Sequence, residues 1–514
     1  MNKRIIIGSR GSKLALWQAN FVKDKLAVIG CDVEIKIIKT KGDQIQDLSF
    51  DKIEGKGFFT KEIENALIEN AIDIAVHSLK DLETTQPNGL ILGAIPVRED
   101  ASDCLLISQK SKDESQLLDL CKNAIIGTSS ARRKNQIKLH RPDTNVKDLR
   151  GNVPTRISKL KNEEYDAILL AKAGLNRLKI DLSEFHIYDL LPSFIISAPA
   201  QGALGLQIRD NDEELISIIK QLNDFSSEKD VNFERKILKG IQGGCHSPFG
   251  AYSKIDKDGN RITWVSYAEK VADVPKRFVT NENNTNSILE QLNNNHSGKK
   301  VWISRKLDKE SIFKRITDAA KFDISDESLI KTNIIHLEKL PDSEWVFFNS
   351  IFSYESIKHL KENFQSKKIG AFGNATSNHL KSNGLKVEFI GTGSPRNVAL
   401  NFSNVVSPNE VVFFPSSNRS LGSVQKELDK ANKIIKETYQ TTLIAKELDS
   451  HDYLIFTSPS NVEAYFSVNS YKSEHVISIG SSTTKELKNA GVNIVHQAYE
   501  STELALADTL LSLN

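Results

Sequence analysis

Arginines in the first half of the sequence fall beside turns where predicted strands end, and together they could bind several carboxylates. Four of them lie within 25 residues and the fifth follows the next predicted strand: Arg132, Arg133, Arg150, Arg156 and Arg177. A guanidinium binds a carboxylate through two parallel hydrogen bonds, which suits a ligand with several acidic arms. One arginine pair alone is better explained as a solvated helix face. Five arginines beside strand ends favour an anion site.

Asp81 is the one carboxylate between His77 and Leu82. Among cations it should stay ionised, so it could stabilise positive charge on a nitrogen heterocycle and move a proton. The alternative for an aspartate after a strand is a helix cap.

Cys245 stands in the segment Gly243-Gly244-Cys245-His246-Ser247-Pro248, where glycine and proline predict an exposed turn. An exposed thiol beside a histidine is reactive more often than a buried one, yet the residues alone leave an inert cysteine open. Lys52 and Lys56 lie in a glycine-rich basic loop, which could close over a ligand or be a plain surface turn.

The elements that must position these side chains follow an α/β pattern, in which β-branched runs end at Gly/Ser/Thr turns and lead into amphipathic helices. We predict strands at residues 4–7, 73–76, 124–127 and 165–171, and helices at 14–24 and 131–140. Ligands of open α/β sheets lie beyond the carboxyl ends of strands, and helix N-termini attract anions. The turns at 8–12, 77–81 and 127–130 are therefore the predicted ligand-binding edge.

Length and composition set the limits. A chain of 514 residues predicts several packing units, and a net charge of +2 argues against a nucleic-acid-binding protein. The four cysteines form no CxxC motif, and no metal site is predicted. We find no secretory signal and no apolar run long enough to span a membrane, so we expect a cytoplasmic protein with no membrane partner.

The later part of the chain changes character. Strands near 261–271 and 277–280, with a helix near 287–292, predict a small α+β unit, and the polar stretch 293–300 predicts a linker. Beyond it Phe348-Asn349-Ser350 recurs as Phe456-Thr457-Ser458, and Gly373-Asn374-Ala375-Thr376 recurs as Gly480-Ser481-Ser482-Thr483. Nearly equal offsets predict two similar α/β lobes in residues 301–514; chance similarity of two strand–turn–helix segments is the alternative.

The first half resembles the porphobilinogen deaminase (hydroxymethylbilane synthase) family through motifs that run in family order over residues 1 to about 292. They are Ser9-Arg10-Gly11-Ser12, Lys41-Gly42-Asp43, Gly55-Lys56-Gly57-Phe58-Phe59, His77-Ser78-Leu79-Lys80-Asp81-Leu82, Gly127-Thr128-Ser129-Ser130-Ala131-Arg132-Arg133, Leu149-Arg150-Gly151-Asn152-Val153-Pro154-Thr155-Arg156, Pro199-Ala200-Gln201-Gly202 and Gly243-Gly244-Cys245. Each is weak alone, and the ordered set is specific. Lys41 and Gln207 stand where the family often has Arg and Glu, and neither is expected to touch the site.

This resemblance implies two periplasmic-binding-protein-like lobes (about 1–97 with 197–217, and 98–196) and a small α+β domain (about 218–292). It implies a dipyrromethane cofactor joined to Cys245 by a thioether, with Asp81 as the catalytic residue. The implied cofactor-binding residues are Lys80, Asp81, Thr128, Ser129, Ser130, Arg132, Arg133, Arg150 and Gly151. The implied substrate-binding residues are Arg10, Ser12, Lys52, Lys56, Phe59, Arg156, Arg177 and Gln201. The implied activity joins four porphobilinogen molecules, with loss of ammonia, into hydroxymethylbilane, in a chain expected to be a monomer.

The second half resembles the uroporphyrinogen-III synthase family more weakly, through segment order in a bilobal α/β module with lobes at about 301–335 with 446–514 and at 342–440. Among the matching segments are Phe414-Pro415-Ser416-Ser417-Asn418-Arg419-Ser420, Thr438-Tyr439-Gln440-Thr441 and Phe456-Thr457-Ser458-Pro459. The implied reaction closes hydroxymethylbilane with inversion of its last ring, and Tyr439 would assist departure of the hydroxyl. Phe352-Ser353-Tyr354 departs from the family pattern.

Three interpretations stay open at this point. The chain is a bifunctional enzyme, a deaminase whose second module is not catalytic, or an anion-binding module that kept the lobes without the chemistry. Tyr439 could equally be a packing tyrosine between the lobes.

Overall fold

A computed structural model describes residues 4–40, 60–241, 248–256, 259–420, 422–428, 432–472 and 474–513. Two compact units divide the chain: unit 1 comprises Met1–Lys112 and Cys121–Asn294, and unit 2 comprises Asp113–Leu120 and Asn295–Leu513. The change from unit 1 to unit 2 near residue 294 falls inside the stretch we predicted as a linker, 293–300. No helix of the described residues is long and apolar enough to cross a membrane.

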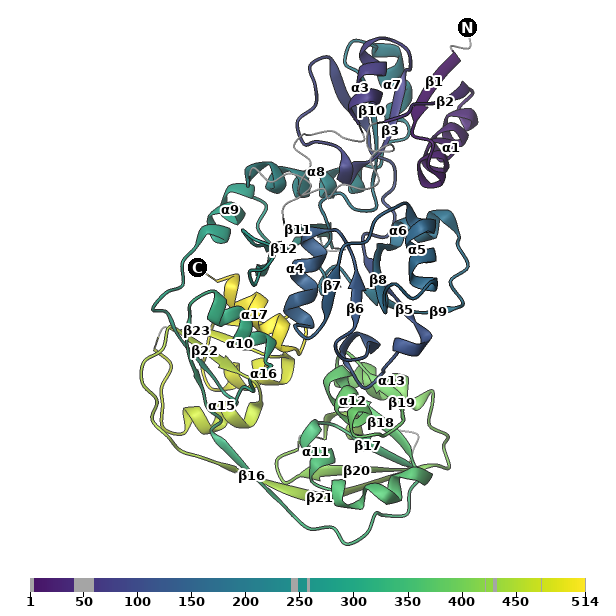
Figure 1. Ribbon diagram of the computed structural model, residues 1–514. Coiled ribbons are helices and arrows are strands. Elements are labelled where there is room, and N and C mark those ends of the chain that lie inside the picture. The colour runs from purple at the N-terminus through teal and green to yellow at the C-terminus, as the bar shows by residue number, and fades with distance from the viewer. Residues whose placement is uncertain are drawn as a thin grey trace. The chain divides into compact units, whose positions relative to one another are not determined.

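The first lobe of unit 1 is built on a five-stranded sheet (Figure 1). Its strand order is β2 (Asp32–Ile37), β1 (Arg4–Ser9), β3 (Ile74–Ser78), β10 (Leu204–Arg209) and β4 (Leu90–Ala94). Its helices are α1 (Lys13–Val28), α3 (Lys61–Ile68) and α7 (Glu213–Lys220). Alternate residues of β1, Ile5 and Ile7, are fully buried with Val22 and Leu26 of α1, so one apolar cluster fixes that helix against the sheet.

The second lobe repeats this topology. Its sheet has the order β7 (Asn145–Lys147), β6 (Ile125–Gly127), β8 (Ala167–Ala171), β5 (Asp103–Ser108) and β9 (Phe185–Leu190). Its helices are α4 (Ala131–His140), α5 (Val153–Lys161) and α6 (Lys172–Leu178). In each sheet the fourth strand, β10 or β5, runs antiparallel to its neighbours. That strand follows a segment that has crossed from the other lobe, so residues 95–102 and 191–203 form the two crossover segments.

The small domain pairs a three-stranded antiparallel sheet with two helices. Its elements are α8 (Phe225–Gly240), β11 (Phe249–Ile255), β12 (Arg261–Tyr267), β13 (Lys276–Thr280) and α9 (Thr285–Asn293). Helix α8 begins after its cap Asp224, whose side chain accepts a hydrogen bond from the Ser227 amide, and it ends at Gly240, five residues before Cys245 in the sequence.

Unit 2 contains two further sheets. The five-stranded sheet has the order β15 (Asp323–Asp326), β14 (Lys300–Ile303), β22 (Tyr453–Phe456), β23 (His475–Ser478) and β24 (Val495–Gln497). Its helices are α10 (Ile312–Ala319), α15 (Pro459–Phe466), α16 (Ser481–Asn489) and α17 (Glu503–Leu511).

The six-stranded sheet has the order β16 (Ile330–Ile334), β21 (Asn432–Leu443), β20 (Val411–Ser417), β17 (Trp345–Phe348), β18 (Lys368–Phe372) and β19 (Val387–Gly391). Its helices are α11 (Ile351–Glu355), α12 (Gly373–Ser382), α13 (Pro395–Ser403) and α14 (Ser423–Glu427).

The repeated motifs occupy equivalent places in these two sheets, as predicted. Phe348 ends β17 and Phe456 ends β22. Two residues later Ser350 and Ser458 cap α11 and α15 with nearly the same backbone angles, and each side chain accepts a hydrogen bond from an amide three residues on. The shared sequence is therefore a shared strand–cap–helix unit.

One strand lies in a different lobe from the one we predicted. Residues 330–334, which we placed with the lobe of residues 301–335, form β16 and pair antiparallel with β21 in the six-stranded sheet. The error arises because a strand that crosses between lobes looks, in sequence, like a continuation of the lobe that it leaves.

Candidate functional site

Three strand-end turns of unit 1 carry the predicted polar residues. Helices α1, α4 and α5 each begin with a side-chain cap, from Ser12, Ser130 and Asn152. The predicted helix at residues 131–140 coincides with α4, whereas the one at 14–24 is part of a longer helix, α1. Because Ser12 and Ser130 accept hydrogen bonds from backbone amides of their own helices, their first task is to start those helices.

The neighbouring hydroxyls also bind the backbone. The Ser129 hydroxyl donates to the Leu149 carbonyl at 2.9 Å and accepts from the Leu149 amide at 3.1 Å. It thereby joins the turn before α4 to the turn that carries Arg150 and Gly151. Gly151 has a φ of 104°, and a Cβ there would lie 2.7 Å from Thr155, so this turn requires glycine.

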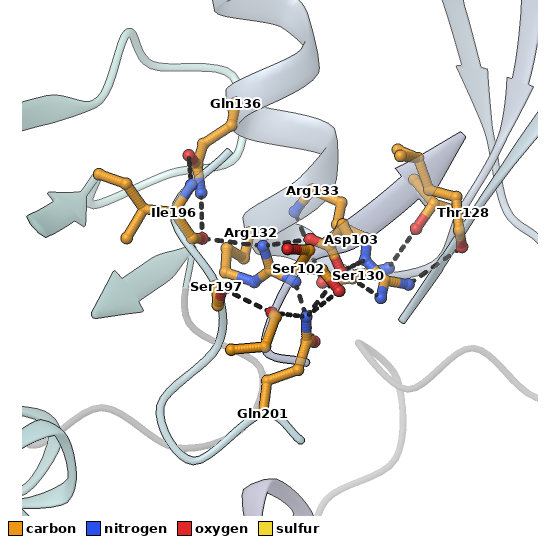
Figure 2. Close-up of polar contacts among 12 residues, drawn as sticks. Ser102, Asp103, Thr128, Ser130, Arg132, Arg133, Gln136, Ile196, Ser197 and Gln201 are labelled. Atoms are coloured by element: carbon orange, nitrogen blue, oxygen red, sulfur yellow. Dashed lines mark hydrogen bonds and ion pairs between the residues drawn. The ribbon is translucent and has the colours of Figure 1, made fainter. Parts of the chain in front are cut away.

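Arg132 and Arg133 point from the start of α4 toward one buried carboxylate, Asp103, at the beginning of β5 (Figure 2). Arg132 donates to Asp103 at 2.8 Å and to the Ile196 carbonyl at 2.9 Å. Arg133 donates twice to Asp103, at 2.7 and 3.2 Å, and to the Leu169 carbonyl at 3.0 Å. Both arginines are buried, so in this structure they bind the protein itself.

The same carboxylate binds Gln201, which we predicted as a substrate residue. Its amide nitrogen donates to Asp103 at 2.8 Å and to the Ala101 carbonyl at 2.7 Å, and its side chain is fully buried. Gln201 therefore joins the two crossover segments in Figure 2. We name Asp103, Arg132, Arg133 and Gln201 the Asp103 network.

Burial by itself would raise the pKa of Asp103, but Arg132 and Arg133 outweigh burial and hold it well below its usual range. The carboxylate is thus ionised, and two guanidinium groups share one negative charge. The network keeps a net positive charge, which favours an anionic ligand nearby.

A second group of charges surrounds Asp81, an exposed residue in the turn Leu79–Asp81. The pKa of half-buried Lys80 is lowered to about 8 by burial and by Arg133 and Arg132, while Asp81 and Asp103 oppose that change. The pKa of Arg156 is lowered to about 10 by burial and by Arg133 and Arg150, while Asp81 opposes it. These couplings place Lys80, Asp81, Arg150 and Arg156 in one electrostatic environment beside the Asp103 network.

The group has more cations than carboxylates: Lys80, Arg132, Arg133, Arg150 and Arg156 against Asp81 and Asp103. Acidic arms of a ligand would favour the charged forms of Lys80 and Arg156. Among the described residues the buried Arg132 Nε has no hydrogen-bond partner, and a ligand oxygen is the kind of acceptor that it lacks. The residue types therefore fit a polycarboxylate pyrrole.

Arg177, which we predicted as a substrate-binding residue, is bound to other parts of unit 1 in this structure. It is buried, donates to the Gly202 carbonyl at 2.7 Å and lies over the Trp17 ring at 5.7 Å. Trp17 belongs to α1 of the first lobe and Arg177 to α6 of the second, so this arginine joins the lobes.

The remaining predicted residues divide into two sets. Arg10 and Ser12 lie at the end of β1 and the start of α1, where Arg10 is half-buried. Lys52, Lys56, Phe59 and Cys245 lie outside the described residues.

A buried ion pair that we did not predict connects all three parts of unit 1. Arg98 binds both carboxylate oxygens of Glu234 on α8, at 2.7 and 3.0 Å. Glu234 also accepts from the amides of Ala200 and Ser253, at 2.7 and 2.8 Å. One carboxylate thus holds both crossover segments and β11 of the small domain.

In strand β3, which leads to the Asp81 turn, His77 forms a buried polar contact with Gln207 of β10. His77 Nε2 lies 3.0 Å from the Gln207 side-chain oxygen, and the Gln207 amide nitrogen donates to Glu64 and Gln86. Burial lowers the pKa of His77 to about 4, although the bond to Gln207 opposes that change. Through these bonds Gln207 supports the strand that leads to Asp81.

This histidine predicts a pH dependence of stability. Its folded pKa lies below its ordinary value of 6.5, so the unfolded chain binds the proton first and stability falls as pH falls from 6.5 toward 4. The loss is about 1.4 kcal/mol per pH unit. Between pH 6.5 and 5, the opening free energy of β3 should fall by about 2 kcal/mol more in the wild-type protein than in His77→Gln. Hydrogen exchange of peptides from β3 measures this free energy. Equal losses would show that His77 is not buried neutral.

In unit 2, Tyr439 lies on β21 and packs edge-on against Phe352 of α11, with ring centroids 5.0 Å apart. Phe352 belongs to the segment that departs from the family pattern. A cavity of about 580 Å³ is lined in part by four residues of Phe414–Ser420, one of the segments that resemble the synthase family. Its lining is Ser416, Ser417, Asn418, Ser420, Gly422, Gln425, Lys426, Lys433, Ile435 and Glu437.

Two family models match the chain. "Porphobilinogen deaminase, dipyromethane cofactor binding domain" matches residues 5–217, and "Uroporphyrinogen-III synthase HemD" matches residues 321–508. A porphobilinogen deaminase of Nitratiruptor sp. is 47% identical over 259 residues, which cover 50% of this chain and 81% of that protein. One of Clostridium novyi is 44% identical over 263 residues, which cover 51% of this chain and 87% of that protein.

Solved structures show weaker similarity. The uroporphyrinogen-III synthetase of Helicobacter pylori has a TM-score of 0.33 at 18% identity and covers 42% of this chain and 99% of its own. An ancestral arginine-binding protein bound to glutamine has a TM-score of 0.25 at 15% identity and covers 47% of this chain and 94% of its own.

Proposed function

This chain belongs to the porphobilinogen deaminase family through its first half and carries a uroporphyrinogen-III synthase domain in its second, and we propose that it performs two consecutive steps of tetrapyrrole synthesis. Unit 1 would join four porphobilinogen molecules into hydroxymethylbilane, and unit 2 would close that product to uroporphyrinogen III. The observation that carries the first step is the exposed carboxylate of Asp81 beside a group of five cations.

The first-half family model is that of a dipyrromethane cofactor-binding domain. When bound at Cys245, the cofactor supplies the pyrrole end to which substrate units are added. Lys80, Arg150 and Arg156 would bind its acidic side chains, together with the amides of the turns at residues 128–130 and 150–151. Arg133 would contribute mainly charge, because Asp103 and the Leu169 carbonyl already bind its donors, whereas Arg132 would contribute charge and its Nε donor.

Asp81 would act on the substrate. Loss of ammonia from porphobilinogen leaves positive charge shared with the pyrrole nitrogen, and a nearby carboxylate stabilises that charge. Asp81 would then accept the proton released when the new carbon–carbon bond forms.

Replacement of this carboxylate tests the first step. Asp81→Asn should lower kcat for porphobilinogen consumption by about 10²–10⁴-fold, since it removes both the charge and the base. Asp24→Asn makes the same chemical change on the exposed face of α1 and should leave kcat unaltered. A wild-type rate in Asp81→Asn would exclude the proposed role.

For the second step we propose that Tyr439 donates a hydrogen bond to the departing hydroxyl. Tyr439→Phe should lower the yield of the type III product by about 10-fold or more, while the rate of porphobilinogen consumption stays the same. Tyr471→Phe removes the same hydroxyl elsewhere in unit 2 and is the control. The edge contact with Phe352 favours the competing role of Tyr439, a packing residue with no part in catalysis. A normal type III yield from Tyr439→Phe would support that function of the residue.

A further inference from the structure

The backbone of the turn that carries Asp81 is bound by one arginine of the small domain. Arg235 of α8 donates from Nη1 to the carbonyl oxygens of Leu79 and Leu82, at 3.0 and 2.9 Å. Its Nη2 donates to the Glu83 carbonyl at 2.6 Å. Asp81 lies between these acceptors in the chain, so the guanidinium holds the turn on both sides of the carboxylate.

Arg235 is rigid in this position because it is buried, with 8% of its surface exposed. A planar guanidinium presents its donors in a fixed fork, so several carbonyls bound to one fork are fixed relative to each other. The turn is also held from the first lobe, since the Leu79 amide donates to the Ala203 carbonyl at 3.0 Å. The side chain of Asp81 itself is exposed, and its position depends on this backbone.

The same helix contacts the turn and its surroundings through neighbouring residues. Val231 of α8 packs in one buried cluster with Leu79, Leu82 and Ala203. Glu234 binds Arg98 and the Ala200 amide in the two crossover segments. Helix α8 therefore holds the turn through the Val231 contact and the Arg235 guanidinium, and it holds the neighbouring crossover segments through Glu234.

We infer that Arg235 is a positioning residue for Asp81. By binding the backbone of residues 79–83 it fixes the position of the Asp81 carboxylate relative to α8, the helix that precedes the Cys245 segment in the sequence. This inference rests on the proposed deaminase function of unit 1.

The test compares three variants of the full chain. Arg235→Met keeps the length and apolar stem but loses the fork, and Arg235→Lys keeps the charge and part of the donors. Arg261→Met is the matched control, because Arg261 is a similarly buried arginine whose guanidinium binds Asp230 of the same helix at 3.0 Å and the Ser253 hydroxyl of β11. Each variant is assayed for kcat and KM with porphobilinogen, for cofactor by intact mass, and for Tm.

Arg235→Met should retain the two-pyrrole adduct and the wild-type KM and lose about 10²-fold in kcat, because a small displacement of a catalytic group has an effect of that size. Arg235→Lys should recover part of the loss, and Arg261→Met should lower Tm without lowering kcat. A wild-type kcat in folded Arg235→Met, or an equal loss in Arg261→Met, would overturn the inference.

If Arg235→Met does not fold, Arg235→Lys decides: a lower kcat at unchanged KM supports positioning, and an unchanged kcat excludes it. Failure of the proposed function has a different signature. In that case the wild-type chain itself would carry no adduct and consume no porphobilinogen.

Discussion

Cys245→Ser is expected to yield a chain with no two-pyrrole adduct and no measurable consumption of porphobilinogen. A hydroxyl is a far weaker nucleophile than a thiolate at neutral pH, so the thioether to the cofactor cannot form. Intact-protein mass detects the adduct directly, and the activity assay measures the resulting loss of porphobilinogen consumption. Because the cofactor is a primer for every product chain, we expect total loss and not a partial one.

Cys31→Ser is the control for this experiment. Cys31 is a partly exposed free cysteine in the first lobe, and burial raises the pKa of its thiol. Its replacement should leave both the adduct and the rate intact. Detection of an adduct on Cys245→Ser, or loss of it on Cys31→Ser, would assign the attachment to another residue.

Asp103→Ala should destabilise unit 1 by about 3–5 kcal/mol, because it leaves two buried guanidinium groups without their carboxylate. Arg132 and Arg133 are 4% and 6% exposed, so water cannot replace the lost partner. The measurement is hydrogen exchange of peptides from β5 and α4, which reports the opening free energy of this region separately from unit 2.

Asp148→Ala is the matched control, since Asp148 pairs with Lys134 of the same helix at 2.5 Å but is 44% exposed. Its removal should change the opening free energy by about 1 kcal/mol or less. If the two substitutions had equal effects, Asp103 would not be the counter-charge of the arginine pair.

The local pattern of the sequence was sufficient to place the elements that carry the site. Helix α4 was predicted to the residue because a β-branched strand, a serine cap and a basic amphipathic run follow one another within one segment. The repeated Phe–x–Ser motif likewise has a local meaning, a strand end followed by a helix cap. Such signals depend only on residues that are close in the sequence, so they predict helices and strands without knowledge of the tertiary structure.

The partners of the arginines could not be predicted in the same way. Arg132 meets Asp103 from 29 positions away and Ile196 from 64, and no local pattern encodes either contact. A buried arginine pair requires a counter-charge. Glu99, Asp100 and Asp103 lie close together in the sequence, and only the fold selects Asp103. The contacts of Arg177 with Trp17 and Gly202 are also long-range and could not be predicted for the same reason.

Arg235 shows the same limit at the site itself. Its sequence context, a helix of ordinary composition, gives no sign of chemistry. Its three acceptors lie more than 150 positions earlier and are backbone carbonyls, which carry no residue identity. The resemblance to known families supplied the roles of Asp81 and Cys245, whereas the structure supplied the supports that fix Asp81.

The measurement that tests the central claim most directly is the isomer composition of the product made by the full chain from porphobilinogen alone. The purified chain is incubated with porphobilinogen, the product is oxidised to uroporphyrin, and the type I and type III isomers are separated by chromatography. If both halves act in sequence, type III should predominate. Type I as the only isomer would contradict a working second half, and a failure to consume porphobilinogen would contradict the whole account.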